Sequence, residues 1–581
     1  MEMNMRIGSR LLFNSILIAV LSILATALLI GYMSFHYGQQ ILEDEARNRL
    51  MLVRDMKADE IRRYFTAMQR ECTLFSNDPT VIDAMKDLNK GFLLYAGEVS
   101  NKGMDKYKDA TINNYIAEFS ADYSKDNGGI AFDATPYLNA TNANTFALQY
   151  NYIFNNPYGI DKEEKLTYVD DGSLYSKFHA QYHEHLRELK LLFGLEDIFL
   201  VDAKTGNIVY TVAKGLDFTT SLINGPYANT ALGRVFNQAN VGNGTKSVIV
   251  SEYEAYAPSN DDQACFIATP IYDNGLKVGI LIFQLDANTV NEIMTSDGRW
   301  SEIGLGKTGE VYLFDANHRV LNNSRFFVEE PEGFEKLLQA NSVSAEDMTR
   351  IKAKQNNIGL MKVNTYAVAE ALQGKTGFIV YKDYRGVEVL GAYEPLNIGG
   401  LKWGILAKID TAEAFSPIYA LAKKLTISLL IISLLIISFA VFAGIALARQ
   451  ISEPIKKLSS AIRLLAESHD LTKRINYENK DEIGDMVTSL NQLLEKFQRS
   501  YQETAMSSEK VQNTAHKLMV LADEIDNREA MHKFEDNFEA VHDKTKELKT
   551  AGDALNELSG RLQQLSRQFK VFEEDSDKTN W

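Results

Sequence analysis

Three histidines lie close together in the chain, at His179, His183 and His185, and histidine is a common ligand of zinc. His179 and His183 are four residues apart, so on a helix they share one face, as zinc ligands do. No HExxH or CxxC motif accompanies them. We therefore interpret these histidines as a structural or solvent-facing cluster rather than a metal site, and we expect no cofactor.

The chain offers little else that could carry out chemistry. Its two cysteines, Cys72 and Cys265, can form a disulfide or remain buried free thiols, since the chain is not a disulfide-dense scaffold. Gly399-Gly400 and Asn274-Gly275 are predicted turns, because no Lys-Ser/Thr of a phosphate loop follows either pair. The formal net charge of -16 argues against nucleic-acid binding. We find no enzyme motif and expect a protein that is not an enzyme.

Two segments that could cross a membrane divide the chain. Residues 11–33 and 425–448 are almost wholly apolar, and each is about as long as the roughly 20 residues of a membrane-spanning helix. The first run exceeds the roughly 7 to 15 apolar residues of a signal peptide, and no small-x-small cleavage site follows it. We therefore predict an uncleaved anchor at residues 11–33 and a second transmembrane helix at residues 425–448.

Basic residues beside these segments predict their orientation. The positive charges on the predicted inner side are Arg6, Arg10, Arg449, Lys456, Lys457 and Arg463. Lys423 and Lys424 give a weaker signal on the opposite side. Because basic residues accumulate on the cytoplasmic side of a membrane, we expect both termini, including residues 1–10, in the cytoplasm. Residues 34–424 would then be periplasmic or extracellular, and the predicted location is the inner membrane.

The outer segment has the pattern of two small modules that follow a helix. Residues 39–88 have a helical pattern and form the predicted stalk. The membrane-distal module, residues 195–295, begins with the strand-turn-strand pattern DIFLVDAKTGNIVYTV, continues with a helix at residues 227–239 and ends with three strands. The membrane-proximal module, residues 300–414, repeats this order from GEVYLFDANHRVL onward. The fold class predicted for the outer segment is therefore α+β, with two antiparallel modules in tandem.

Several quoted segments of this region resemble a known class of sensor. GKTGEVYLFDANHRVL and GAYEPLNIGGLKWGILAKIDTAEAF resemble double Cache domains, in which two PAS-like modules stand on a long first helix. DDGSLYSKFHAQYH followed by DIFLVDAKTGNIVYTV is similar to a sensor subtype of bacterial chemoreceptors and nucleotide cyclases. The resemblance covers residues 39–414. It implies that a small-molecule ligand binds in the membrane-distal module.

A pocket in that module would lie between the helix at residues 227–239 and the sheet that faces it. The candidate ligand contacts are Tyr227, Arg234, Tyr253, Tyr256 and Gln284. Arg234 can pair with a carboxylate or be a solvated helix residue, and the tyrosines can be pocket walls or packing residues. Amino-acid-binding double Cache sensors resemble one another in an Arg-x-Trp-Tyr run and an acid on the last strand. Here Arg234-Val235-Phe236-Asn237 and Gln284 stand in those places. A neutral amide balances an ammonium less well than an acid does, which argues against an α-amino acid ligand and leaves a carboxylate or another small metabolite equally open.

A polar connector, DLTKRINYENKDEIGDM at residues 470–486, separates two segments with coiled-coil patterning. Apolar residues recur at steps of four and three on both sides of it: Ile451, Ile455, Leu458, Ile462 and Leu465, then Ile483, Met486, Leu490, Leu493 and Phe497. Neither helix can bury such a stripe alone. We therefore predict a homodimer in which two chains form a parallel four-helix bundle.

This arrangement resembles a HAMP domain, which we predict at residues 449–500. The predicted signalling residues are Pro454, Leu458, Leu471, Ile475, Glu482 and Ile483. Pro454 would open the first helix and Glu482 the second, while Leu471 and Ile475 would pin the connector against the bundle. His469 stands where HAMP connectors commonly have Gly, so a positive φ there would carry modest strain. A bundle with two nearly equivalent packings can act as a transmembrane switch.

The remaining residues, 501–581, continue as a predicted coiled coil. Its apolar positions are Val511, Leu518, Leu521 and Ile525, and then, after a phase slip, Met531, Phe534, Phe538, Val541, Leu548, Leu555, Leu558, Leu562, Leu565 and Phe569. The end, AGDALNELSGRLQQLSRQFKVFEED, resembles the carboxyl-terminal helix of chemoreceptors. At a helical rise of about 1.5 Å per residue the region is too short for a full chemoreceptor hairpin, and the tip sequence is missing. This predicts a shortened hairpin and argues against contact with the chemotaxis kinase and its coupling protein.

Together these resemblances imply a receptor similar to methyl-accepting chemotaxis proteins. It would sense a small ligand outside the cytoplasm and pass a conformational change through HAMP to the coiled coil. The alternative is a signalling-deficient receptor or scaffold that pairs with full-length receptors or with a separate effector.

Overall fold

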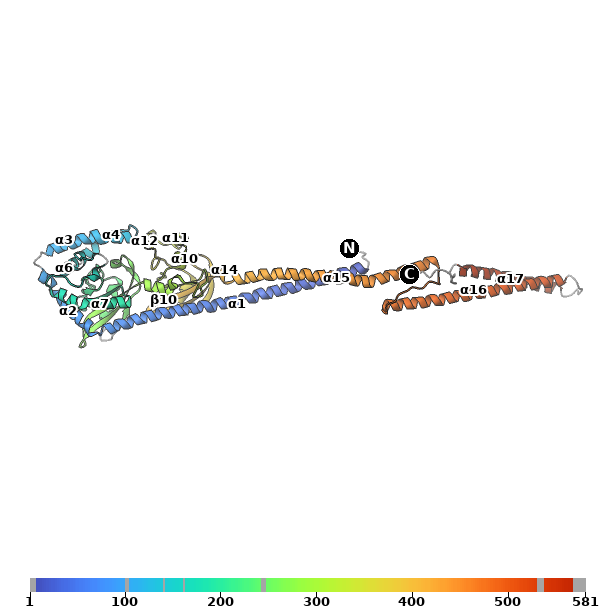
Figure 1. The fold of residues 1–581 in the computed structure, drawn as a ribbon, viewed down its shortest axis with the longest axis horizontal. Helices are drawn as coiled ribbons and strands as arrows, with labels where there is room; N and C mark the ends of the chain where they lie inside the picture. The colour runs from blue at the N-terminus through green and yellow to red at the C-terminus, as the bar shows by residue number, and fades with distance from the viewer. Residues whose placement is uncertain are drawn as a thin grey trace. The chain divides into compact units, whose positions relative to one another are not determined.

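The computed structural model describes residues 7–99, 104–138, 142–159, 162–241, 247–529 and 538–567. They form two compact units (Figure 1). The central unit is Ser34–Ala422, and the terminal unit combines Met1–Met33 with Lys423–Trp581. The central unit contains two antiparallel sheets, as the alternating patterns predict, and the terminal unit is helical.

The first sheet belongs to the membrane-distal module and has the order β2-β1-β6-β5-β3, with β4 also paired to β5. Its strands are β1 (Asp197–Asp202), β2 (Ile208–Thr211), β3 (Ile249–Val250), β4 (Glu254–Tyr256), β5 (Asp262–Asp273) and β6 (Leu276–Asp286). Asp202 closes the β1–β2 turn by accepting hydrogen bonds from the backbone N and Oγ1 of Thr205, both at 2.7 Å. Asn274 and Gly275 both have positive φ between β5 and β6, which confirms the predicted tight turn.

Both faces of this distal sheet are buried. The helices that cover it are α1 (Ile7–Phe75), α2 (Pro79–Val99), α7 (Leu174–Phe193) and α8 (Ala231–Val241). Because side chains alternate along a strand, Leu281 and Phe283 of β6 join the core shared with α1, α2 and α7, whereas Ile280 and Ile282 join the core under α8. The predicted helix at residues 227–239 is confirmed as α8, slightly displaced along the chain.

Between α2 and α7 the chain folds into short helices for which the sequence patterns gave no assignment. They are α3 (Met104–Asn114), η2 (Tyr115–Phe119), α4 (Ser120–Asp126), α5 (Thr135–Leu138), α6 (Ala143–Gln149), η3 (Tyr150–Phe154) and η4 (Glu163–Lys165). Within the central unit, α3 and α4 lie along the same side as α12 (Ala345–Lys354) and α11 (Pro331–Ala340) of the second module (Figure 1).

The second, membrane-proximal sheet has the order β7-β10-β9-β8. Its strands are β7 (Glu310–Phe314), β8 (Gly377–Lys382), β9 (Glu388–Ile398) and β10 (Leu401–Asp410). The other elements between β3 and the membrane-proximal end are η5 (Ala257–Ser259), α9 (Asn288–Thr295), η6 (Ser296–Gly298), α10 (Arg325–Glu329), α13 (Tyr366–Leu372) and α14 (Thr411–Ala414).

The predicted second strand of the proximal hairpin, at the end of GEVYLFDANHRVL, is absent as a strand; Val320 makes only an isolated bridge to Phe314. The backbone ladder is limited to bonds such as that from Leu321 N to the carbonyl of Leu313, at 2.8 Å, and beyond it a side chain takes the place of a partner strand. Asn322 accepts from the backbone N of Leu313 at 2.8 Å and donates to the carbonyl of Val311 at 3.2 Å. These bonds satisfy the edge of β7 without a regular partner strand.

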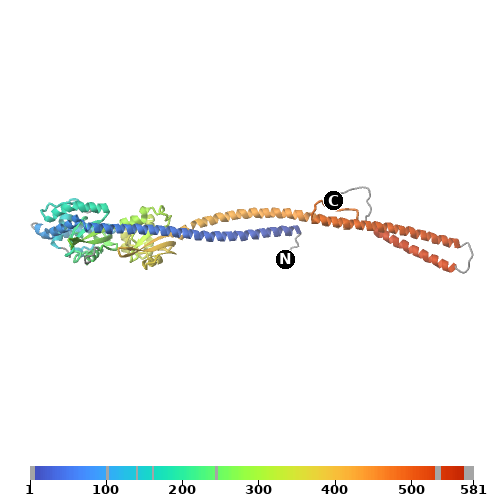
Figure 2. The same cartoon turned by 90° about the horizontal axis from the view of Figure 1, so that it is seen from below.

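The long helix also differs from the prediction, because α1 ends at Phe75 and α2 begins at Pro79 instead of one helix over residues 39–88. Pro79 lacks an N–H and disfavours a helical conformation at Asp78. The carboxylate of Asp78 accepts from the backbone N of Thr80 at 2.7 Å and starts α2. Before the break, the outer part of α1 runs past both modules (Figure 2).

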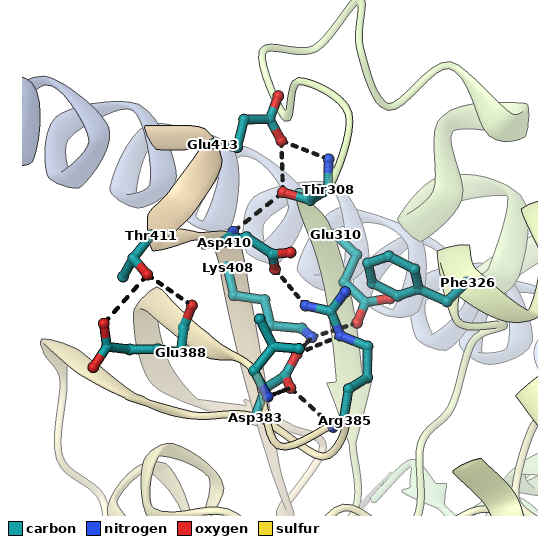
Figure 3. A network of polar contacts seen from close by, with 12 residues as sticks. Thr308, Glu310, Phe326, Asp383, Arg385, Glu388, Lys408, Asp410, Thr411 and Glu413 are labelled. Atoms are coloured by element: carbon teal, nitrogen blue, oxygen red, sulfur yellow. Dashed lines mark hydrogen bonds and ion pairs between the residues drawn. The ribbon is translucent and has the colours of Figure 1, made fainter. Parts of the chain in front are cut away.

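A buried ionic network occupies the end of the proximal sheet (Figure 3). Lys408 on β10 is fully buried, and its Nζ lies 2.9 Å from Glu310 and also contacts Asp383. Arg385 pairs with Asp383 at 2.7 Å and with Asp410. Loss of one partner from such a buried pair costs about 3–5 kcal/mol, because the other charge stays buried. The network therefore fixes the end of β10, where the chain turns toward the second span.

Glu413 of α14 ties this region to the start of β7. Its carboxylate accepts from the backbone N of Lys307 and of Thr308, both at 2.7 Å, and from Thr308 Oγ1 (Figure 3). Partial burial would raise the pKa of Glu413, but these hydrogen bonds hold it below its ordinary value. Charge-assisted hydrogen bonds from Lys307 and Thr308 thus hold α14, which follows β10, against the segment before β7.

In the terminal unit, α15 (Ser416–Ser468) contains the second predicted span and α1 the first. Both helices have a stretch long and apolar enough to cross a membrane, and that stretch is not buried within the protein. The prediction that Pro454 opens a helix is wrong, because Pro454 lies inside α15. Because α15 continues directly from the span, Pro454 meets an existing helix, and its missing N–H leaves the carbonyl of Gln450 without its usual donor.

The connector of the predicted HAMP domain joins α15 to α16 (Glu482–Glu529), which starts at the predicted residue Glu482. His469 has a φ of 53°, so the predicted positive φ is present. Leu471 packs in an apolar cluster with Leu494 of α16. The backbone N and O of Ile475 are both hydrogen-bonded to the side chain of Asn491, at 3.0 and 2.9 Å. The connector therefore lies along α16, held at both predicted residues.

α16 forms a hairpin with α17 (Phe538–Arg567). Small side chains fill its interior: Ser508 and Ser559 are buried, and their hydroxyls lie 2.6 Å apart. The heptad leucines instead face outward, and Leu521 and Leu558 are 51% and 55% exposed in the single chain. Of the predicted apolar positions, Met531, Phe534 and Phe569 lie outside the described residues.

Candidate functional site

A cavity of about 410 Å³ opens at one end of the distal sheet, on the face that α8 also covers. Its walls come from the short helices, from the end of α7, from residues 213–217 after β2, from the segment before β5 and from β6. The lining side chains used below are Asp122, Glu163, Glu164, Lys190, Glu196, Asp197, Lys214, Asp217, Tyr256, Ser259, Asn260, Asp262 and Gln284. The cavity lies beside the distal sheet but not between the helix at residues 227–239 and that sheet, where the pocket was predicted.

Negative charge dominates the lining, which has seven carboxylates (the aspartates and glutamates just named) and two lysines. Some of these acids are already paired. Glu164 lies 2.7 Å from Lys190, and Asp262 lies 2.7 Å from Lys354. Within the described parts of the chain, Glu196 and Asp217 have no Lys, Arg or His at ion-pair distance. The cavity therefore holds carboxylates that no protein cation neutralises.

Asp217 is more buried than Glu196, with 2% of its surface exposed. Its Oδ2 accepts a short hydrogen bond from the hydroxyl of Tyr256. Burial, and then the nearby Asp197 carboxylate, raise the pKa of Asp217 to about 7, although the Tyr256 hydrogen bond opposes this. Below pH values of about 7 this carboxyl group is therefore mostly protonated.

Asp197 and Lys214 form the floor of the cavity. Asp197 Oδ1 accepts three backbone N–H groups, from Ile198, Val212 and Ala213, at 2.7 to 2.9 Å. Lys214 donates to the carbonyl of Thr211 at 2.6 Å. Burial raises the pKa of Asp197 and lowers the pKa of Lys214, so burial disfavours the charged form of each group.

The two buried histidines lie behind this floor and have a structural role. His179 and His183 are fully buried and stacked, with ring centroids 4.4 Å apart, whereas His185 is exposed. His183 Nε2 is 2.7 Å from the carbonyl of Glu164, which can only accept, so Nδ1 accepts from the Tyr210 hydroxyl at 2.7 Å. Burial lowers the pKa of both rings, for His183 to about 3. These neutral rings support the cavity wall that contains Glu164.

The structure brings only part of the predicted pocket set to this cavity. Tyr256 and Gln284 line it, and Gln284 Nε2 donates to Ser259 Oγ at 2.9 Å. Tyr253 lies on the other face of the sheet, where its hydroxyl donates to the carbonyl of Asp286. Tyr227 is packed against Tyr256 in the core under α8, with ring centroids 5.9 Å apart.

Arg234 also lies outside the cavity. It sits on the exposed side of α8, where its guanidinium pairs with Glu254 and donates to the carbonyl of Asn229 at 2.8 Å. The buried side of α8 is apolar, with Leu232, Val235 and Phe236 against the sheet. α8 therefore fills the middle of this face, and the cavity is displaced toward the short helices.

Sequence reasoning missed Asp197, Lys214 and Asp217, which contribute most of the cavity chemistry. Asp197 begins a strand, and the other two lie in an irregular loop without periodicity. The only local signal is charge next to apolar strands, which also describes an ordinary solvated turn. Their burial depends on helices about 50 to 100 residues earlier in the chain, which no local pattern reveals.

The cysteines and acids of the described region form no metal site. Both cysteines are buried free thiols, which decides between the two alternatives left open by the sequence. Among the residues that the structure describes, no group of three or more His, Cys, Asp or Glu side chains could hold a metal ion.

Two domain families match the chain in the regions just described. Residues 137–418 match the Cache domain, which includes both sheets, and residues 446–499 match the HAMP domain. The fold and these matches define a Cache domain that is joined to a HAMP domain through a helix long and apolar enough to cross a membrane.

The chain is similar to two proteins of known class. It is 23% identical over 258 residues to the methyl-accepting chemotaxis protein McpA of Pseudomonas putida, which covers 44% of this chain and 34% of that protein. It is 22% identical over 279 residues to the methyl-accepting chemotaxis protein PctB of Pseudomonas aeruginosa, covering 47% and 38%. The matched region thus spans little more than a third of either relative. With its Cache and HAMP domains, the chain resembles receptors of the methyl-accepting chemotaxis protein class.

Solved structures with similarity to the chain include ligand-binding domains of chemoreceptors. One is that of the Pseudomonas aeruginosa amino acid chemoreceptor PctB in complex with L-Arg, at 14% identity and a TM-score of 0.26, covering 54% of this chain and 93% of that one. Another is that of the Pseudomonas fluorescens chemoreceptor CtaA in complex with L-isoleucine, at 14% identity and a TM-score of 0.23, covering 39% and 73%.

We predict that Asp217→Asn stabilises the empty protein in a pH-dependent way. Because the pKa of Asp217 is raised from 3.8 to about 7, the folded state binds more protons than the unfolded state between these values, and wild-type stability falls as pH rises. The variant lacks this penalty. Its free energy of unfolding should gain on the wild type by about 1.4 kcal/mol per pH unit over this range and level off above pH 7.

Chemical denaturation of the full chain at several pH values measures this difference. Asp170→Asn, which removes an exposed carboxylate of the same central unit, is the control. A stability difference between Asp217→Asn and wild type that stays constant from pH 5 to pH 8 would contradict the buried, protonated state of Asp217.

Proposed function

We propose that this protein is a chemoreceptor-type signal transducer that senses a small ligand with a cationic ammonium group. The observation that carries the proposal is the cavity lined by seven carboxylates and two lysines, with Asp217 and Glu196 unpaired among the described residues. An ammonium group would replace the proton on Asp217 and form an ion pair with the carboxylate of Glu196. Tyr256 and Gln284 would then orient the ligand through their polar groups.

The sensor would lie in the periplasm, with both termini in the cytoplasm and the two spans in the inner membrane. The basic residues beside the spans support this orientation. A ligand-induced change in the central unit would reach α15 through β10 and Glu413, and α15 continues without a break into the HAMP region. The transduction step needs a conformational change and no chemical reaction.

The first test is thermal unfolding of the full chain in lipid nanodiscs with 1,4-diaminobutane, L-arginine or succinate. A ligand at about 100 times its dissociation constant adds about 2.7 kcal/mol of stability. We expect an amine-bearing compound to raise the unfolding midpoint and succinate to leave it unchanged. Asp217→Asn should abolish the ligand-induced increase.

Arg234→Ala is the matched control, since Arg234 lies on the surface outside the cavity. It should keep the full ligand-induced increase. Stabilisation by succinate alone, or loss of the increase in Arg234→Ala but not in Asp217→Asn, would show that the ligand is an anion recognised near α8.

We also propose that the receptor is a homodimer through HAMP and the hairpin. In the single chain, Ile462 on α15 is 45% exposed, and Met486 and Leu493 on α16 are 61% and 50% exposed. Apolar stripes of this kind on two helices need a second copy to be buried. The bundle formed by two chains would be the element that switches.

A cysteine at Ile462 should therefore form a disulfide between subunits in membranes after mild oxidation, because this position faces the dimer axis. Arg463→Cys, one residue away and off the stripe, is the control and should cross-link far less. The measurement is the fraction of dimer on a non-reducing gel. Equal cross-linking at both positions would argue against the HAMP bundle.

A second candidate is a receptor that acts only through pairing with other chains. The short α16–α17 hairpin favours it, together with the outward-facing leucines Leu521 and Leu558. Other chemoreceptors or a separate effector could supply the partner helices. Direct contact with the chemotaxis kinase and coupling protein would then come from the partner receptor.

A further inference from the structure

One connection between the cavity and the second module is the turn Asn260–Asp261, between η5 and β5. Both residues have positive φ, 52° and 62°, although neither is glycine. Asn260 lines the cavity, as do Pro258 and Ser259 before it and Asp262 after it. A ligand that fills the cavity therefore meets this turn directly.

The turn is held on one side by the short helix α4. The hydroxyl of Tyr123 donates to Asp261, and Asn260 Nδ2 donates to Asp126 at 2.9 Å. The fully buried Asn127 donates to the carbonyl of Asn260 at 3.0 Å. α4 thus forms a strap over the turn, and the preceding η2 places Phe119 in the cavity wall.

On its other side, the turn is held by α12 of the proximal module. Lys354 Nζ lies 2.7 Å from the carbonyl of Asn260 and 2.7 Å from Asp262. Arg350 lies 3.4 Å from Asp261. These basic side chains are only 10% and 16% exposed, so their pairs are partly shielded from solvent.

The same contacts form a continuous path from the cavity to the proximal core. Asp217 is bonded to the Tyr256 hydroxyl, and the carbonyl of Tyr256 accepts from the backbone N of Asp261 at 3.0 Å. Asp261 pairs with Arg350, and its helix neighbour Ile351 is buried in the core that contains Leu406 of β10. β10 leads into α14 and then α15.

We infer that the Asn260–Asp261 turn is the element that reports cavity occupancy to the proximal module, through Arg350 and Lys354. The inference rests on the proposed function, in which the cavity is where the ligand binds. Occupancy would displace the turn, and α12 would follow because two of its three basic residues, Arg350 and Lys354, are bound to the turn. Ligand binding itself does not require this link, so binding and transmission can be separated by substitution.

The test replaces the ligand with a side chain, so that it does not depend on the ligand class. Ala213 lines the cavity and contributes only its backbone N to Asp197. Ala213→Trp would fill the cavity from the floor. Hydrogen exchange of the α12 amides is then compared, by mass spectrometry on the full chain in nanodiscs, with and without the double substitution Arg350→Ala/Lys354→Ala.

We expect Ala213→Trp to change α12 exchange rates by about fivefold or more, the range of an ordinary coupling between sites. In the Arg350→Ala/Lys354→Ala background the change should fall below about twofold. Lys352→Ala is the matched control: it lies on the same helix but pairs with Glu335 at 2.7 Å, away from the turn, and should preserve the change.

Two results would overturn the inference: no change at α12 on filling the cavity, or an equal change when Arg350 and Lys354 are both alanine. If Ala213→Trp does not fold, Ala213→Phe provides the same comparison with a smaller side chain. Failure of the amine titration with preserved coupling would reject the ligand class alone. Ligand stabilisation that persists while coupling fails would reject the turn alone.

Discussion

The central unit depends on one helix that both of its sheets share. α1 packs Phe65 against Trp403 of the proximal sheet, with ring centroids 5.3 Å apart, and places the Cys72 thiol 3.5 Å from the carbonyl of Ile267 in the distal sheet. Burying one such side chain contributes about 1.5–3 kcal/mol. Neither sheet could bury its inner face without α1, so both modules are fixed to the helix that contains the first span. A second contact between the modules lies where α4 meets α12.

Much of the fold could be predicted from the sequence, because its signals are local. The alternation in KVGILIFQL and the Asn274-Gly275 pair are sufficient for β6 and its turn, and apolar runs are sufficient for the spans. Predictions failed where a side chain replaced a backbone interaction, as Asn322 does beside β7, or where a helix already existed, as at Pro454. The periodicity of apolar residues does not show that a side chain will bond to a strand edge or that a helix will continue through a proline.

The site was harder to predict than the fold for a related reason. Arg234 was a candidate because arginine binds carboxylates. However, the apolar side of α8 packs on the sheet, so Arg234 lies on the exposed side of that helix. Asp217, in contrast, lies in an ordinary sequence context, and only packing against residues distant in the chain buries it and raises its pKa. A buried carboxyl group without a cation costs stability, which is a common property of binding sites prepared for a charged ligand. Tyr256 and Gln284 were identified because they lie on regular strands.

The central claim is that a ligand cation takes the place of the proton on Asp217. Isothermal titration of the full chain with 1,4-diaminobutane at pH 6, in buffers of different ionisation enthalpy, measures the number of protons exchanged on binding. Since the pKa of Asp217 in the empty cavity is raised to about 7, the account predicts release of about one proton per ligand bound. Binding with no proton release, or with proton uptake, would contradict it.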